Sequence, residues 1–142
     1  MKVSAELTMA PAPVEEIQLP DGLVGFPDYQ RFTVQYQEDQ LPFCWLRLFG
    51  PADELHFVVI EPGHVLPDYE PELFEEDAEW LELNDSSEAL VLNIVTVVHG
   101  AQASATVNLT GPVIINRRTG KAKQVVLANH GNYNARHPLV TG

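Results

Sequence analysis

The sequence has few of the residues on which disulfide frameworks and nucleic-acid surfaces depend. It contains one cysteine, Cys44, which excludes an internal disulfide and favours a reducing compartment. Lysine and arginine number 8 against 20 aspartates and glutamates, and a net charge of −12 repels phosphate backbones and anionic membranes. No signal-peptide pattern follows Met1, and the longest apolar run, Ala89–Val98, is too short for a membrane-spanning helix, which needs roughly twenty residues. We therefore expect a cytoplasmic protein.

The patterns that accompany catalysis are also missing. No serine lies in a Gly-x-Ser-x-Gly elbow, and no acidic cluster has the spacing of a calcium loop. Cys44 alternates with apolar residues, which indicates a structural thiol. The five histidines are scattered and no two are spaced i, i+4, so a zinc site made from three of them stays open with little support. We expect no cofactor and no metal.

The apolar content is that of an ordinary globular protein. Hydrophobic residues make up 45% of 142 residues, which predicts one domain over 1–142 with a well-buried core. Ala89–Val98 is predicted to be the central strand, because its β-branched residues favour a strand and both of its faces are apolar. We expect other parts of the fold, among them the helix that precedes it, to cover both faces. Asn93 is the polar exception and should hydrogen-bond the backbone of a neighbouring loop.

Short alternating segments separated by turns make up most of the remaining chain. One helix is predicted at Glu75–Leu83, with acidic residues in its first turn, Ala78 and Leu81 inward, and no good N-cap at Phe74. Phe43–Phe49 and Leu55–Ile60 read as an antiparallel hairpin. The other predicted strands are Val3–Met9, Val14–Leu19, Phe32–Tyr36, Ala105–Thr110, Val113–Asn116 and Lys121–Leu127. Eight or nine short strands with one helix indicate a mostly β fold, an antiparallel barrel or sandwich.

Charge divides the chain at the central strand. Residues 1–88 hold all 20 acidic residues and three basic ones, whereas residues 89–142 hold the other five basic residues. Eight acids fall within residues 68–82, mixed with Tyr69, Phe74 and Trp80, a composition suited to docking a basic, partly apolar partner. The alternative is a solvated helix face with its aromatics turned inward. The basic cluster between Arg117 and Lys123 is interpreted as a solvated turn.

Eight segments follow one another in a characteristic order along the chain: LPDGLVGFPDYQRF (19–32), PFCWL (42–46), FVVIEP (57–62), PDYEPEL (67–73), LVLNIVTV (90–97), ATVNLTGPVIIN (105–116), GKAKQVVL (120–127) and YNARHPL (133–139). In these segments and their order, over about residues 17–139, the chain resembles the FliW family of bacterial flagellar assembly factors. The first sixteen residues match least well, and family members often carry Ser or Asp where Phe74 stands.

The resemblance implies a small antiparallel β-barrel-like domain without enzymatic activity. It implies that the protein binds and antagonises CsrA, a small dimeric RNA-binding regulator that represses flagellin translation. FliW-type proteins also bind flagellin, which competes with the regulator, so that flagellin synthesis is coupled to flagellum assembly. The resemblance therefore implies a monomeric binding protein or chaperone with no direct contact to nucleic acid or membrane.

We place the partner-binding surface on the acidic segment, because a basic RNA-binding regulator would be attracted to it. An acidic-site hydrolase or a sugar-binding β-domain is the alternative, and it would need a deep pocket with convergent carboxylates or a bound metal. A third possibility, an RNA binder in its own right, predicts that the pure protein shifts RNA mobility, and we expect no shift. The predicted partner-facing residues are Asp68, Tyr69, Glu70, Glu72, Glu76 and Asp77.

Overall fold

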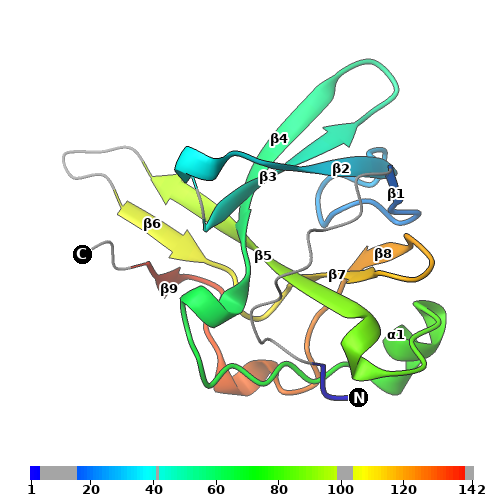
Figure 1. Cartoon of the computed structure of the whole chain (residues 1–142), viewed down its shortest axis with the longest axis vertical. Coiled ribbons are helices and arrows are strands. Elements are labelled where there is room, and N and C mark those ends of the chain that lie inside the picture. Colours follow the sequence, from blue (N-terminus) through cyan, green and yellow to red (C-terminus); the bar gives the residue numbers. More distant parts are fainter. Residues whose placement is uncertain (4–15, 41, 99–103, 140–142) are drawn as a thin grey trace.

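The computed structural model describes residues 1–3, 16–40, 42–98 and 104–139, and most of its regular elements are strands (Figure 1). None of the described helices is long and apolar enough to cross a membrane. The strands are β1 (Ile17–Gln18), β2 (Arg31–Tyr36), β3 (Phe43–Phe49), β4 (Glu54–Ile60), β5 (Ala89–Val98), β6 (Ser104–Val107), β7 (Val113–Asn116), β8 (Ala122–Gln124) and β9 (His137–Pro138). The helices are α1 (Glu75–Trp80) and the 3-10 turns η1 (Glu38–Gln40), η2 (Pro62–His64), η3 (Ser86–Glu88) and η4 (His130–Asn132).

All paired strands are antiparallel, and together they form a curled sheet. The main path runs β1-β2-β3-β4-β5-β6-β9, while β7 pairs with both β5 and β8. The curl runs from β1 through β5 to β7 and β8. Strand β1 and the start of β8 meet at a single bridge between Gln18 and Lys121, where the Gln18 amide donates to the Gly120 carbonyl at 2.9 Å. The sheet is therefore barrel-like without being a closed barrel, which confirms the predicted mostly β fold with one short α-helix.

Strand β5 separates two hydrophobic cores. Leu90 and Leu92 face the inside of the curl, where they join buried residues from β1, β2, β3, β4, β7 and β8. Ala89 and Val91 face the other way and pack with Leu81, Leu83 and other buried residues of an outer core. The predicted cover on both faces is therefore present over the first part of β5, where the inner side is filled by the interior of the curl and the outer side is packed against Leu81 and Leu83, just after α1. We call these the inner core and the outer core.

The second half of β5 extends beyond the residues that cover its first half. Its first four residues pair with β7 and its last four pair with β6, while β4 contacts it only through three pairs ending at Val58 and Val95. Beyond that pair, the β3–β4 hairpin and the β5–β6 pair diverge, as the upper part of Figure 1 shows. Val97 is consequently 46% exposed, although Val91 on the same face is buried.

The predicted elements are largely present, with some differences in length. Strands β3, β5 and β7 have the predicted bounds, whereas α1 ends at Trp80 and not at Leu83. The helix stops because Glu82 adopts a left-handed backbone, with φ of 57°, that no α-helix continues. β8 is shorter than its prediction and β9 was not predicted. Most of the predicted strand Val3–Met9 lies outside the described residues.

Candidate interaction surface

The acidic segment predicted to face a partner lies between η2 and the first turn of α1. The side chains of Asp68, Glu70 and Glu76 are exposed, and that of Glu72 is half-buried. Asp68 and Glu76 form no ion pair with any described residue, and Glu70 makes only a loose, exposed pair with Lys2 at 4.0 Å. Four of the six predicted residues thus retain a carboxylate that can meet a partner.

Tyr69 is a correction, because its side chain belongs to the outer core and is only 3% exposed. Its hydroxyl donates to the Leu109 carbonyl at 2.5 Å and accepts from Asn93 Nδ2 at 3.4 Å, and burial raises its pKa. The ring packs edge to face against Tyr133, with 4.7 Å between centroids. Tyr69 therefore fastens the acidic segment to the sheet and presents no side chain to a partner.

Asp77 is a second correction, because it is committed to an internal ion pair. Its carboxylate accepts from Lys123 Nζ at 2.7 Å and is 16% exposed. Beside it, Lys121 Nζ lies 3.9 Å from the centre of the Trp80 ring and donates to the Trp80 carbonyl at 2.9 Å. The basic cluster predicted to be a solvated turn instead packs against α1. Its Lys123 neutralises the charge of Asp77, on the inward side of the helix.

The same turn also holds the connection from α1 to β5. Arg118 Nε donates to Glu88 Oε2 at 2.6 Å, and its Nη2 donates to the Glu82 carbonyl at 2.7 Å. This pairing, helped by amides that donate to the same carboxylate, lowers the pKa of Glu88. Asn116 completes the junction by donating to the Leu81 carbonyl at 2.7 Å. The connection from α1 to β5 is therefore held by side chains of the turn between β7 and β8.

An open apolar groove of about 450 Å³ lies where β4 and β5 diverge. Trp45 forms part of its wall and is held in place by donating from Nε1 to Gln40 Oε1 at 2.8 Å. The groove was not predicted from the sequence, although alternation along β3 puts Phe43 and Trp45 on the same face. Its lining residues are Asp39, Gln40, Phe43, Trp45, Val58, Val95, Val97, Ala105 and Leu139.

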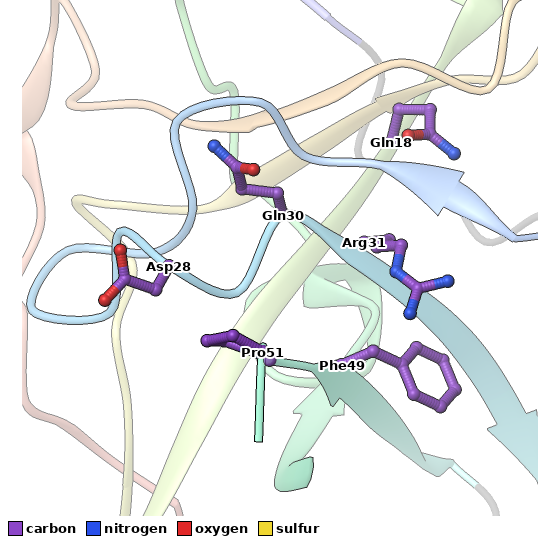
Figure 2. A pocket seen from close by; sticks show the side chains of 7 residues that line it. Gln18, Asp28, Gln30, Arg31, Phe49 and Pro51 are labelled. Carbon is purple, nitrogen blue, oxygen red and sulfur yellow. The ribbon is translucent and has the colours of Figure 1, made fainter. Parts of the chain in front are cut away.

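A second, more polar pocket of about 320 Å³ opens beside the start of β2 (Figure 2). Arg31 points along it, but its guanidinium is paired with Glu16 at 3.1 Å and lies 5.3 Å from the centre of the Phe49 ring. Arg47 lies 5.2 Å from the same ring, so two cations already occupy the aromatic surface on which a sugar would stack. The lining residues are Gln18, Asp28, Gln30, Arg31, Phe49, Gly50 and Pro51.

Neither cavity has the features required by the alternative of a hydrolase or sugar-binding domain. Asp28 is the one carboxylate lining the polar pocket and Asp39 the one lining the groove, so neither brings two together among the described residues. Within that part of the chain, no three His, Cys, Asp or Glu side chains are grouped to hold a metal ion. The fold and surface define a small antiparallel β protein with an exposed acidic segment and, lined by other residues, an open apolar groove.

Comparison with known proteins identifies the family to which this β protein belongs. The sequence pattern of the family described as "FliW protein" matches residues 2–139. The chain is 40% identical to the flagellar assembly factor FliW of Natranaerobius thermophilus, over 87% of this chain and 80% of that protein. It is 38% identical to the FliW of Geobacter sulfurreducens, over 87% of this chain and 75% of the relative. The chain belongs to the FliW family.

A solved structure agrees with this membership. The crystal structure of a flagellar assembly factor FliW superimposes with a TM-score of 0.77 at 27% sequence identity, covering 100% of this chain and 99% of the other. The sequence resemblance noted for residues 17–139 is thereby confirmed for the family and for the fold.

Proposed function

We propose that this protein is a non-enzymatic regulatory binding protein of flagellum biogenesis that acts in the cytoplasm. It binds a CsrA-type RNA-binding regulator and, in competition, flagellin. When free flagellin accumulates it takes up the protein, and the released regulator represses flagellin translation. Membership of a family whose members are named flagellar assembly factors supports this function.

The observation that carries the proposal is the fixed, outward-facing acidic segment. Asp68, Glu70, Glu72 and Glu76 project from a backbone anchored by Tyr69, on a molecule with a net charge of −12. A protein that binds RNA offers positive charge, so the two surfaces attract one another. A bound anionic protein also weakens RNA binding through its electrostatic field, even where the two do not overlap. We assign these four carboxylates to the regulator-facing surface.

The test is a pair of double charge reversals that change the net charge equally. In D68K/E76K the reversed residues lie on the acidic segment, and in the control D21K/D28K they are exposed residues of the β1–β2 connection. The association rate constant with purified regulator is measured by stopped flow at several ionic strengths. We expect D68K/E76K to associate about tenfold more slowly at low salt and to show a flatter salt dependence.

The control pair keeps both the rate constant and the salt slope close to those of the wild type. Equal losses in the two double variants would mean that only net charge matters, and would remove the acidic segment from the proposed interface. In the same series, added flagellin should displace the regulator. The protein alone should run as a monomer and should leave the mobility of RNA unchanged.

A further inference from the structure

We propose that the apolar groove binds an amphipathic helix of a partner protein. Two or three large apolar side chains of that helix enter the groove, and a lysine or arginine of the helix lies against Asp39. The chemistry of the bound helix is inferred from the groove itself. Only the identity of the partner that carries this helix rests on the proposed function.

The floor of the groove is a continuation of the outer core, and the described residues that seal that core near α1 do not extend over it. Trp45, Val58 and Val95 are directly paired across β3, β4 and β5, so their side chains share one face of the sheet. Nearer α1, that face is sealed by Leu81 and other core residues. At Val97 the cover has ended, and an apolar side chain on a packed face is 46% exposed.

The width of the groove fits a helix. Apart from η1 and Leu139, its lining residues come from the neighbouring strands β3, β4, β5 and β6. Where these strands are paired, at about 4.8 Å each, they span about 14 Å from first to last, and beyond the Val58–Val95 pair β4 and β5 lie farther apart. An α-helix with its side chains is about 10–12 Å across, whereas a single added strand would fill only a third of that width. Apolar residues spaced i, i+3 and i+4 on such a helix would reach Trp45, Val58 and Val97 together.

The charge of the groove selects a basic helix. Asp39 is the one charged residue among the described lining residues, and it follows Glu38 in the exposed turn η1. Neither Glu38 nor Asp39 forms an ion pair with any described residue, and no described lysine or arginine lines the groove. A lysine flanking the apolar stripe of the helix can lay its methylenes along the groove and bring its ammonium to Asp39.

The groove contains its own spectroscopic reporter. The protein has two tryptophans, so the variant W80F leaves Trp45 as the single tryptophan, inside the proposed site, and its emission can be excited selectively over that of the tyrosines. The probe is a synthetic 18-residue helix with leucines on one face and lysines on the other. The counter-probe carries glutamate at every lysine position. We expect the leucine–lysine peptide to shift Trp45 emission to the blue saturably, and the leucine–glutamate peptide to bind at least about tenfold more weakly.

Substitutions in the W80F background locate the binding. V97D places a charge in the groove, and V126D places the same charge at a valine that is 58% exposed and does not line it. V97D should weaken peptide binding at least about tenfold and V126D should leave it unchanged, even though both make the protein more attractive to a cationic peptide. The charge reversal D39K should invert the preference between the two peptides.

Equal binding by V97D and V126D would overturn the proposal, as would a blue shift of the same size with both peptides. A concentration-dependent dimer that V97D dissociates would also overturn it, because the groove would then be an interface between copies of this chain. The proposed function is tested separately, by binding of wild-type protein to purified flagellin and regulator. Failure of both partners to bind would remove that function and leave the peptide result intact.

Discussion

Glu82 holds a backbone conformation that L-residues rarely adopt, and it does so to end α1. Among the described non-glycine residues it is the one with a positive φ, 57°. Its amide donates to the Glu79 carbonyl and the amide of Leu83 donates to the Ala78 carbonyl, which is the hydrogen-bonding pattern of a Schellman C-cap. Glycine is the residue usually found at this position because it has no Cβ to clash with the carbonyl oxygen.

Replacing Glu82 with glycine should therefore stabilise the protein. We expect E82G to raise the free energy of unfolding by about 1 kcal/mol, since the strain of the left-handed backbone is removed and the exposed side chain has no described partner. The matched control is E79G, at an exposed position inside α1, which should lower it by about 1 kcal/mol. Urea unfolding measures both values, and a destabilised E82G would contradict the assignment of strain to this residue.

Two of the predicted site residues show that composition does not determine whether a side chain lies on the surface or in the interior. Tyr69 and Asp77 lie in a run of acids and aromatics that reads as a surface, and both face inward. Tyr69 packs in the outer core and donates its hydroxyl to the Leu109 carbonyl, and Asp77 pairs with Lys123 of β8, which lies 46 residues later. Neither partner is near in sequence, so no local pattern could assign these two side chains to the interior.

Among the elements, η3 depends on ionised carboxylates for its geometry. Asp85 accepts from the Ser87 amide and Glu88 accepts from the Asp85 amide, which makes a capping box that Arg118 closes from outside. These contacts lower the pKa of Glu88 and of Asp85. A carboxylate whose pKa is lower in the folded state stabilises the fold above its ordinary pKa, and that contribution is lost as the pH falls through the folded value.

The lowered pKa of Glu88 leads to a pH-dependent prediction for the variant E88Q. At pH 7 the variant should melt at a lower temperature than the wild type, because the charge-assisted bond from Arg118 is weakened. Between about pH 5 and pH 3 the difference should shrink, since Glu88 of the wild type then becomes protonated. Thermal melts at four pH values measure it, with E79Q as the control at an exposed residue. A gap that stays constant with pH would show that the carboxylate charge has no part in holding η3.

The regular strands could be predicted from sequence, and the irregular connections could not. The bounds of β3, β5 and β7 follow from alternation and β-branched residues, because burial on a pleated surface selects those patterns directly. The two-residue strand β9 has no pattern of its own and exists because His137 and Pro138 meet β6. The groove likewise draws its lining from five separate elements and from Leu139, so it became visible only when the curl of the sheet was known.

At the scale of the whole molecule, the two cores share β5 and should unfold together. Cys44 lies in the inner core, where burial raises the pKa of its thiol to about 11, so labelling at pH 8 reports the opening of that core. Trp80 packs against the outer core and reports its opening by fluorescence in a W45F background. We expect the two probes to give the same urea midpoint.

The variant L92A tests the coupling. It removes a buried side chain from the inner core alone and should cost about 2–5 kcal/mol. If the cores are one cooperative unit, the Trp80 transition moves to lower urea together with the Cys44 labelling transition. A Trp80 midpoint unchanged by L92A would show that the outer core unfolds on its own, and would contradict the prediction that the two cores unfold together.

The bridge between Gln18 and Lys121 also has a consequence in time. The curl can close only after the residues of the β7–β8 turn have been synthesised, and β6 gains its outer neighbour only at His137 and Pro138. Contacts so distant in sequence make folding slow, because a long loop must close before they form. A newly made chain therefore completes its sheet only once His137 and Pro138 have been synthesised, and until then neither the acidic face nor the groove is fully assembled. The supply of folded protein therefore follows the synthesis of these late residues and lags behind the initiation of the chain.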